Sequence, residues 1–238
     1  FGLVGLLNSL HLLGRKAPLS IYAPPQLKAI LDLQLDASGG RMQYPIHFHA
    51  IEPFEAGSIS IHEDSQVKVE GVNLKHRIKC YGFRFTETEK EFSYLPEKGG
   101  PAGIKVEEIP VLKQGSDVVR TDGTTFDHRL YTVPPPPQRS YAYCTDTLPL
   151  DSTVEFVKGA DLLYHESTFL EKEQQRSKET YHSTAKEAAD VAKRAGVKRL
   201  MLGHYSARYT ELDEHLSEAK SIFSDVILSK EGLEVEIN

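Results

Sequence analysis

The last third of the chain alternates short apolar strands with helices, and three of the predicted strands lead into a residue that binds metals or transfers protons. In α/β sheets such side chains meet beyond the carboxyl ends of neighbouring strands, while the strand bodies stay packed. The pattern therefore predicts a functional site at one edge of a sheet. The predicted strands and the residues after them are 140–145 before Asp146, 162–164 before His165, and 199–202 before His204.

A helix is predicted just before the last of these strands. Thr184 and Glu187 have the spacing of a capping box, alanines recur at helical spacing from Ala188 to Ala195, and Gly196 ends the run. Strands that alternate with helices in this way are typical of the parallel part of a sheet.

The start of the chain predicts a helix, a strand and a second helix. Leucines from Leu3 to Leu13 repeat at helical spacing up to Gly14, which indicates a buried helix. Residues 19–23 indicate a short strand, and Pro24-Pro25 opens a helix that we expect to reach Leu33. The apolar run begins at Phe1 with nothing before it to cap it, so we expect that a preceding segment is missing.

The middle of the chain is predicted to be rich in β-structure. Short alternating runs from Tyr44 to Phe85, broken by glycines, indicate antiparallel strands. The segment from Glu91 to Gly115 shows no period, and we expect an extended loop or arm. The two halves together predict two sheets sandwiched by helices.

The composition fits one globular domain in a reducing compartment. The 238 residues are 39% hydrophobic and 26% charged, which is enough to build a sizeable core. The two cysteines, Cys80 and Cys144, are too few for a disulfide framework, although a single disulfide is left open. No run approaches the length that spans a bilayer, so we expect a cytoplasmic protein that makes no membrane contact.

The net charge of −6 excludes a generally basic surface for nucleic acid. Any contact with RNA must then come from local positive charge or from metal ions. The sequence offers two such places, the alternating Lys75, Arg77 and Lys79 and the lysines from Lys98 to Lys113. Solvated surface is the ordinary meaning of residues like these.

His76 adds a fourth candidate ligand, because it lies at a predicted turn between two strand-like runs. Imidazole and carboxylate are the ligands of a hydrolytic zinc site. One such residue alone is usually structural, whereas four at strand ends favour a site. His47 and His49 share one face of a predicted strand and are interpreted as its polar face. The remaining histidines are interpreted as structural or exposed: His11, His62, His128 and His215.

Four segments in series resemble the ribonuclease Z family of the metallo-β-lactamase superfamily. His76 with Gly82-Phe83-Arg84 resembles the central histidine motif of that family, and Phe1 to Leu6 resembles the stretch directly after its His-x-His-x-Asp-His signature. The resemblance covers essentially the whole chain, and the signature itself would end just before Phe1. The four segments are Ser140–Thr147, Leu163–Phe169, Tyr181–Thr184 and Gly203–Tyr209.

The resemblance implies an α+β four-layer αββα sandwich, the metallo-β-lactamase fold. The chain would be a single domain, 1–238, with a possible arm at 91–115. It would be a zinc-dependent endoribonuclease that cleaves the 3′ trailer from precursor tRNA through attack by a metal-activated water. Two Zn²⁺ per subunit, a homodimer and a precursor tRNA partner are implied as well.

The resemblance also assigns roles to residues. His76 would complete one zinc site and His204 the second, and Asp146 would bridge both ions. His182 would give a proton to the leaving oxygen, a task for a group that titrates near neutral pH.

Four further residues receive less definite roles. Glu166 would orient a histidine or be structural, and His165 would support the ligands from behind. Ser206 and Arg208 would meet substrate phosphate, although Arg208 could equally pair with a nearby acid.

Two other functions stay open on the sequence. A hydrolase with the same fold could act on a small phosphodiester or ester, which an acidic chain favours. A metal-free binding module is the alternative from a different class, because the signature that supplies further ligands is not among these residues.

Overall fold

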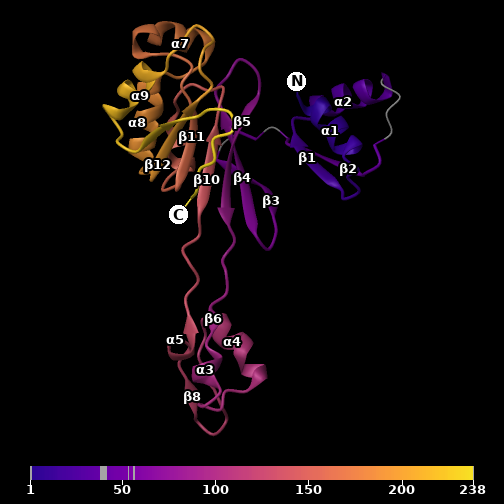
Figure 1. Cartoon of the computed structure of the whole chain (residues 1–238), viewed down its shortest axis with the longest axis vertical. Helices are drawn as coiled ribbons and strands as arrows, with labels where there is room; N and C mark the ends of the chain where they lie inside the picture. Colours follow the sequence, from indigo (N-terminus) through magenta and orange to yellow (C-terminus); the bar gives the residue numbers. More distant parts are fainter. Residues whose placement is uncertain (1, 38–41, 53, 56, 238) are drawn as a thin grey trace.

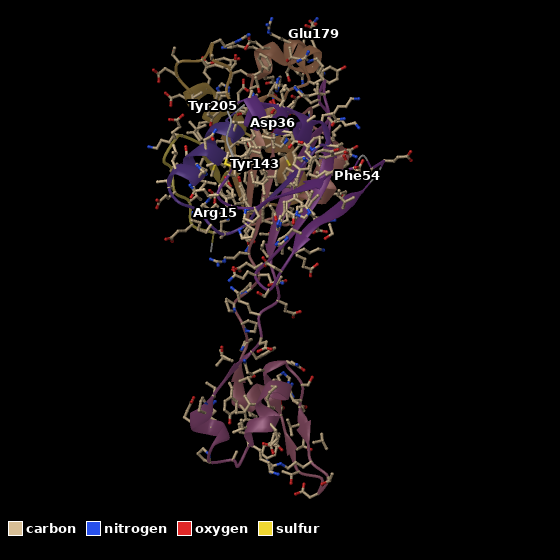
Figure 2. All side chains as sticks on the ribbon, turned by 90° about the vertical axis from the view of Figure 1, so that its right-hand side faces the viewer. Arg15, Asp36, Phe54, Tyr143, Glu179 and Tyr205 are labelled. Carbon is tan, nitrogen blue, oxygen red and sulfur yellow. The ribbon has the colours of Figure 1, made fainter. Side chains whose placement is uncertain are left out.

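The computed structural model describes residues 2–37, 42–52, 54–55 and 57–237 of the chain. Figure 1 shows three parts: an N-terminal unit of helices and strands, a large mixed sheet covered by helices, and an arm that extends away from both. The arm again stands clear of the rest in the side view of Figure 2.

The large sheet has seven strands in the order β13-β12-β11-β10-β5-β4-β3. β10 to β13 are parallel to one another, whereas β3, β4, β5 and β10 pair antiparallel. The predicted mixture of β-hairpins and βα units is therefore confirmed. The strands are β3 (Ser58–Glu63), β4 (Val67–Leu74), β5 (Cys80–Glu87), β10 (Ser140–Cys144), β11 (Leu162–Glu166), β12 (Arg199–Gly203) and β13 (Val226–Leu228).

The carboxyl ends of β10, β11 and β12 lie next to one another at one edge of this sheet. Cys144 pairs with His165, and Glu166 pairs with Gly203. Residues that leave these strands are thus held within a few ångströms of each other by backbone pairing, as the sequence predicted.

Helices α6 (Asp151–Phe156), α8 (Ala185–Ala195) and α9 (Asp213–Lys220) pack against the main core of the protein. The buried face of α8 is made of alanines and Val191, and small side chains let a helix lie close to a sheet. The predicted capping box of Thr184 and Glu187 is present, and Gly196 ends α8 with φ +63°.

The N-terminal unit consists of α1 (Leu3–Leu12), β1 (Leu19–Ala23), α2 (Gln26–Ala37) and β2 (Ile46–Ala50). β2 pairs with β1 in parallel, so the expectation of antiparallel strands throughout 44–85 is wrong at its start. A parallel pair needs a crossover, and α2 supplies it. Phe1 lies outside the described residues.

The expectation that the first helix is buried is also wrong. Leu7 is fully buried beneath Tyr44, whose hydroxyl donates a hydrogen bond to the Leu7 carbonyl. Leu12 and Leu13 are more than 80% exposed and Leu6 is about half exposed. The leucine pattern predicted the helix correctly. However, the leucines lie on more than one side of the helix, and the small N-terminal unit buries one side alone.

The arm comprises the folded segment from Ser93 to Val133 on a stalk made of residues 88–92 and 134–138. It has its own small core of Leu112, Val118 and Phe126. The segment 91–115 therefore contains short helices rather than an extended loop. The elements of the arm are β6 (Ser93–Tyr94), α3 (Pro96–Gly99), η1 (Val106–Glu108), α4 (Ile109–Lys113), β7 (Val118–Val119), β8 (Thr125–Phe126), α5 (His128–Tyr131) and β9 (Thr132–Val133).

Both cysteines are free thiols, which answers the question of a disulfide within the chain. Burial raises the pKa of Cys144 to about 12 and that of Cys80 to about 11, so both are unreactive near neutral pH. None of the helices in the described ranges is long and apolar enough to cross a membrane.

Candidate active site

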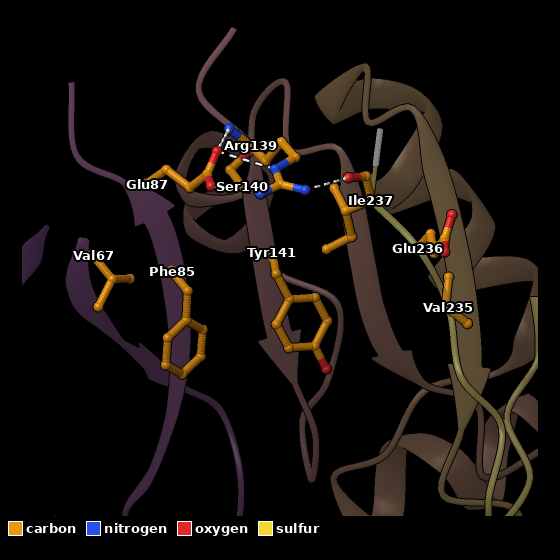
Figure 3. Close-up of a pocket in the computed structure, with 9 residues that line it drawn as sticks. All are labelled: Val67, Phe85, Glu87, Arg139, Ser140, Tyr141, Val235, Glu236 and Ile237. Carbon is orange, nitrogen blue, oxygen red and sulfur yellow. Dashed lines mark hydrogen bonds and ion pairs between the residues drawn. The ribbon is translucent and has the colours of Figure 1, made fainter. Parts of the chain in front are cut away.

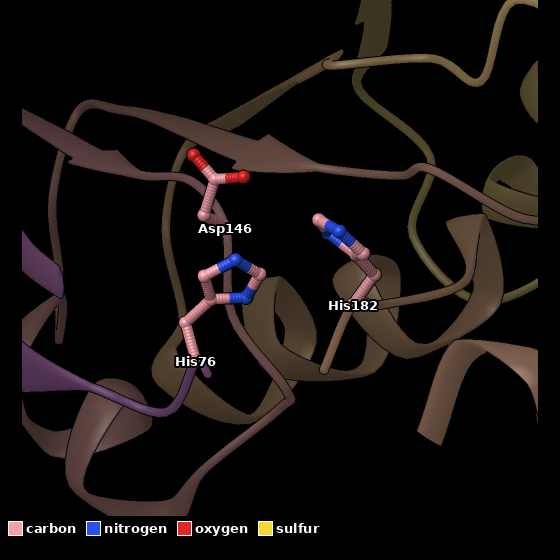
Figure 4. Close-up of side chains that lie close together, drawn as sticks. All are labelled: His76, Asp146 and His182. Atoms are coloured by element: carbon pink, nitrogen blue, oxygen red, sulfur yellow. The ribbon is translucent and has the colours of Figure 1, made fainter. Parts of the chain in front are cut away.

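Four polar side chains from four different loops meet at the carboxyl edge of the large sheet. His76 follows β4, Asp146 follows β10, His182 precedes α8 and His204 follows β12. Figure 4 shows His76, Asp146 and His182 gathered in one place, and their ligating atoms all lie within 4.8 Å of one another. His204 Nε2 lies 3.3 Å from Asp146 Oδ1. The structure thus brings together His76, Asp146, His182 and His204, whereas His165, the other strand-end residue that the sequence singled out, stays outside this cluster.

Three residues at this edge have a left-handed backbone. They are Asp146 (φ +53°), Tyr181 (φ +62°) and His204 (φ +57°), and they are the non-glycine residues with positive φ in the described part of the chain. Each such residue costs on the order of 1–2 kcal/mol. Backbone strain of this kind gathers at functional sites, where the surrounding structure holds side chains in place.

The three histidines each use Nδ1 for a hydrogen bond within the protein. His76 Nδ1 lies 3.2 Å from the Tyr181 carbonyl oxygen, and His182 Nδ1 lies 2.8 Å from Glu166 Oε1. Carbonyl and carboxylate oxygens only accept hydrogen bonds, so both Nδ1 atoms carry a proton. His204 Nδ1 lies 2.8 Å from the Thr168 hydroxyl.

The Thr168 hydroxyl also lies 2.6 Å from Glu166 Oε2, to which it donates its proton. It therefore accepts a hydrogen bond from His204 Nδ1. The neutral form of each histidine then presents the lone pair of Nε2, which is the arrangement that metal-binding histidines commonly have.

Glu166 is hydrogen-bonded to His182 and Thr168 and so links the residues that hold the cluster. It is fully buried at the end of β11, and its oxygens accept hydrogen bonds from the N–H groups of Thr147 (2.6 Å) and Ser183 (3.0 Å) as well as from His182. Burial alone would raise the pKa of Glu166, but the hydrogen bonds from His182, Ser183 and Thr168 lower it overall. Glu166 is thus a buried, ionised anchor for the histidine loop.

His182 is partly buried and lies between the other two histidines. Its ring centroid is 5.1 Å from that of His76 and 5.2 Å from that of His204. The hydrogen bond to Glu166 raises the pKa of His182 against the opposite effect of partial burial, and the charges of Glu166 and Asp146 raise it further. His182 is therefore suited to carry a proton near neutral pH.

The donor set fits a divalent metal such as zinc. A second group, Glu166, His182 and His204, also has its ligating atoms within 4.8 Å. However, both Glu166 oxygens already accept hydrogen bonds, whereas the ion pair of Asp146 within the described part of the chain is the one to His204. Asp146 and the Nε2 atoms of His76, His182 and His204 therefore remain available to an ion.

A third group of possible ligands lies in the arm and is explained by its structural bonds. Asp127 caps α5 and forms an ion pair with Arg129, and Asp117 Oδ1 lies 2.9 Å from His128 Nδ1. These contacts hold the end of α5 in place.

His165 lies inside β11 rather than beyond it, and its ring is fully buried. Its Nδ1 lies 2.8 Å from the Glu166 carbonyl oxygen, and burial lowers its pKa. His165 is absent from each group of possible ligands in the described chain. It supports the backbone of Glu166 and does not join the cluster.

Ser206 and Arg208 lie in the loop that follows His204. Arg208 Nη1 lies 2.7 Å from Glu173 Oε1. Arg208 therefore pairs with a nearby acid, which was one of the two roles that the sequence allowed, and that acid is Glu173. Arg208 Nε also donates to the Ser206 hydroxyl at 3.0 Å.

Sequence reasoning gave no role to Thr168 or Tyr181, although both stand in the segments that carried the resemblance. The remaining histidines are outside the cluster. His47 is exposed on β2, and His49 stacks on Tyr22.

A cavity of about 550 Å³ lies at the opposite end of β10, at the root of the arm (Figure 3). Arg139 forms its rim through a double hydrogen bond to Glu87 and one to the Ile237 carbonyl oxygen. No histidine of the cluster lines this cavity. The cavity is therefore separate from the candidate active site, in spite of its volume.

Comparison with known proteins gives relatives over the whole chain. It is 39% identical to ribonuclease Z of Porphyromonas gingivalis over 237 residues, which is 100% of this chain and 77% of that protein. It is 42% identical to ribonuclease Z of Cytophaga hutchinsonii, covering 98% of this chain and 74% of that protein. A model of the beta-lactamase superfamily domain matches residues 131–205.

Solved structures with the same fold include human tRNase Z, short form, with a TM-score of 0.66 and 23% identity. The match covers 100% of this chain and 74% of the human chain. A long form RNase Z from yeast matches with a TM-score of 0.62 and 13% identity, over 96% of this chain and 30% of the yeast chain. These likenesses confirm the metallo-β-lactamase fold.

Proposed function

Since this chain belongs to the ribonuclease Z family, we propose that it is a zinc-dependent endoribonuclease that removes the 3′ trailer from precursor tRNA. Membership confirms the resemblance seen in the sequence, and it makes the chain a hydrolytic endoribonuclease. The observation that carries the assignment of the site is the convergence of His76, Asp146, His182 and His204 at the carboxyl edge of β10, β11 and β12.

His76, Asp146 and His204 would hold two zinc ions in each subunit, together with ligands from elsewhere in the protein. When bound, zinc supplies an acidified water and neutralises charge on the phosphate. Asp146 would bridge the two ions, because its carboxylate faces His204 on one side and lies in one cluster with His76 on the other.

His182 would donate a proton to the 3′-oxygen that leaves when water attacks phosphorus. Glu166 holds His182 by Nδ1, which leaves Nε2 for that oxygen. The same hydrogen bond favours the protonated ring. Glu166 and Thr168 together fix His182 and His204 in one geometry, so the proton donor and a ligand are positioned by a single buried network.

The loop that carries His76 provides local positive charge for RNA. Lys75, Arg77 and Lys79 are exposed and form no ion pair with any described residue. These three cations flank the cluster itself, and phosphate contacts of this kind give affinity in a chain with a net negative charge.

The arm would bind the tRNA at a distance from the cut, because it stands far from the cluster on a narrow stalk (Figure 1). Net charge does not favour RNA binding there, since residues 88–138 contain six Lys and Arg against eight Asp and Glu. Lys113 and Arg120 are moreover paired with Glu91 and Glu108. A partner would instead contact the arm through its shape and through three exposed apolar side chains: Val106, Val119 and Leu130.

We further propose that the enzyme is a cytoplasmic homodimer. Exposed apolar side chains give the N-terminal unit a surface suited to a second copy: Leu6 and Leu12 of α1, Leu13 directly after it, and Ile30 and Leu33 of α2. Light scattering on the enzyme and on a Leu12→Asp, Leu13→Asp variant tests this: the variant should be a monomer.

Competition between substrates tests the proposed function. Unlabelled precursor tRNA should inhibit hydrolysis of bis(p-nitrophenyl) phosphate at concentrations where mature tRNA without a trailer inhibits less. Efficient hydrolysis of the small diester without any effect of precursor tRNA would instead favour a small-substrate hydrolase.

The arm has a test of its own. β5 and β10 are antiparallel neighbours, with Thr86 opposite Ser140, so residues 89–137 can be replaced by a short turn without breaking the sheet. The shortened enzyme should cleave precursor tRNA with a raised KM and hydrolyse the small diester normally. Equal loss on both substrates would mean that the arm supports the fold.

A further inference from the structure

The loop from Tyr205 to Tyr209 directly follows His204 of the candidate active site, and one acidic residue holds it. Glu173, in η2 (Glu171–Glu173), accepts a hydrogen bond from Arg208 Nη1 at 2.7 Å through Oε1. Its other oxygen accepts a hydrogen bond from the Tyr209 hydroxyl. A single carboxylate thus holds two consecutive side chains of the loop that begins at His204.

Arg208 is also held by an aromatic ring and a hydroxyl. Its guanidinium carbon lies 5.2 Å from the centroid of the Phe169 ring, a distance typical of a cation–π contact, and Nε donates to Ser206 at 3.0 Å. Phe169 is buried, and its ring lies 6.2 Å from that of His182. Arg208 is therefore separated from the proposed proton donor by one ring.

The contacts of Arg208 leave part of the guanidinium unused. Nε and Nη1 have protein partners, whereas no residue within the described ranges accepts a hydrogen bond from Nη2. The side chain is 37% exposed. A planar guanidinium that is fixed on two sides and open on a third is well suited to bind a phosphate oxygen with little further loss of side-chain entropy.

The backbone of the loop is equally well anchored. Tyr209 packs edge-on against the buried His215 with ring centroids 4.6 Å apart, and its hydroxyl accepts a hydrogen bond from the Leu170 N–H at 3.3 Å. Ser206 N donates to the Thr168 carbonyl oxygen at 3.2 Å. With both ends fixed, the orientation of Arg208 depends on Phe169, Ser206 and Glu173, and Glu173 is the one of the three with a charge opposite to that of the guanidinium.

We propose that Glu173 is a positioning residue for substrate: it holds Arg208 so that the free edge of the guanidinium binds an RNA phosphate next to the one that is cleaved. This inference rests on the proposed function. Glu173 does not touch the substrate, and its effect reaches the RNA only through Arg208.

The opposite role is physically possible and predicts the opposite sign. If Glu173 instead competed with phosphate for Arg208, removing its charge would free the arginine and strengthen RNA binding. Steady-state kinetics of Glu173→Gln on precursor tRNA distinguish the two. The glutamine keeps an acceptor for Tyr209 but loses the ionic bond to Arg208.

We expect Glu173→Gln to raise KM for precursor tRNA roughly three- to tenfold, with kcat changed less than about twofold. The slope of log affinity against log salt should fall by about 0.7, because one phosphate contact to a single strand is lost. Hydrolysis of bis(p-nitrophenyl) phosphate, which has no second phosphate for Arg208 to bind, should change far less than cleavage of precursor tRNA. An unchanged or lowered KM in Glu173→Gln overturns the proposal.

A double-mutant cycle separates positioning from general support of the fold. Glu173→Gln should have no further effect on KM in an enzyme that already carries Arg208→Ala, because its only route to the RNA is gone. The same fold-increase in both backgrounds would contradict the proposal. Arg208→Lys should resemble Arg208→Ala more than the parent, since an ammonium cannot reproduce the fork of the guanidinium.

Glu214→Gln is the matched control. Glu214 pairs with Lys172, a neighbour of Glu173, at 2.7 Å on the exposed surface, and it has no contact with the 205–209 loop among the described hydrogen bonds and ion pairs. Its KM should equal that of the parent. Failure of the parent enzyme to cleave precursor tRNA would overturn the proposed function itself, whereas a normal parent with an unaffected Glu173→Gln overturns the positioning role alone.

Discussion

Asp146 Oδ1 and His204 Nε2 lie 3.3 Å apart although 58 positions separate the two residues, and both have a left-handed backbone. The parallel pairing of β10, β11 and β12 brings the two loops together. The left-handed turn at each residue then aims its side chain across the sheet edge. The carboxylate oxygen and the imidazole nitrogen can both bind the same divalent cation, and the fold holds them close to each other.

Replacing Asp146 with asparagine should remove most bound metal and nearly all hydrolysis. The neutral amide keeps the size of the side chain but cannot bridge two dications. Elemental analysis and precursor tRNA cleavage measure the two effects. The same loss of both in Asp32→Asn, the same chemical change at an exposed carboxylate of α2, would show that the assay reports folding rather than ligation.

His182→Ala should behave differently from Asp146→Asn. A positioned acid contributes about 10²- to 10⁴-fold to a rate, so kcat should fall by that range while the metal content stays close to that of the parent. An unchanged kcat across the pH range would remove the role of proton donor. Loss of metal would move His182 into the ligand set.

Gly203→Ala should destabilise the protein and weaken the site together. A Cβ at Gly203 would overlap the Tyr164 hydroxyl oxygen, and Gly203 directly precedes His204. Displacing the tyrosine costs about 1–3 kcal/mol as overpacking. Thermal melting and metal titration check both effects, and Gly5→Ala, where a Cβ meets nothing within 4 Å, is the control.

The ion pair between Lys198 and Asp161 should make the stability of the protein depend on pH at values below the ordinary pKa of an aspartate. Burial would raise the pKa of Asp161, but Lys198 at 2.6 Å and the hydrogen bonds from Ser140 lower it overall. Because the pKa is lower in the folded protein, the stabilisation is present above the ordinary value of 3.8 and is lost as the pH falls through the folded value.

Lys198→Met should therefore lower the melting temperature by about 1–3 °C at pH 7, and the difference from the parent should shrink below pH 3.8. Lys158→Met, which removes an exposed partner of Glu155, should leave the pH profile unchanged. A difference that grows towards acid pH would contradict the assignment.

The stalk should lose its stiffness when its prolines are replaced. Pro134 to Pro137 form one side of it, and a proline run is semi-rigid and extended. Changing all four to serine should raise KM for precursor tRNA by a few-fold, because a mobile arm must be ordered on binding. Circular dichroism should show an unchanged fold, and a normal KM would mean that arm orientation is unimportant.

Much of the site was predictable because its residues stand at the ends of apolar strands. The order of Asp146, His165 and His204 along the chain predicted side chains beyond neighbouring strands of a parallel sheet, which is correct for Asp146 and His204 but wrong for His165, because β11 runs one residue further to Glu166. Thr168 was missed, because a hydroxyl in a short motif gives no sign of which way it points. Its role depends on Glu166 and His204 meeting at one oxygen, which only the folded chain shows.

The fold was less predictable where contacts are non-local or elements are short. The parallel pairing of β1 with β2 depends on the crossover helix between them, and alternation of apolar residues does not report strand direction. The helices of the arm have three to five residues, which is too few to show a period. The exposure of Leu12 and Leu13 could not be read from their spacing, because spacing gives the helix but not what covers it.

Release of a labelled 3′ trailer from precursor tRNA tests the central claim most directly. The parent enzyme should release the trailer, lose that activity in a chelator and regain it with added zinc, while Asp146→Asn stays inactive under every condition. Undiminished trailer release by Asp146→Asn, or by the chelated parent, would contradict a metal-dependent site at the edge of β10, β11 and β12.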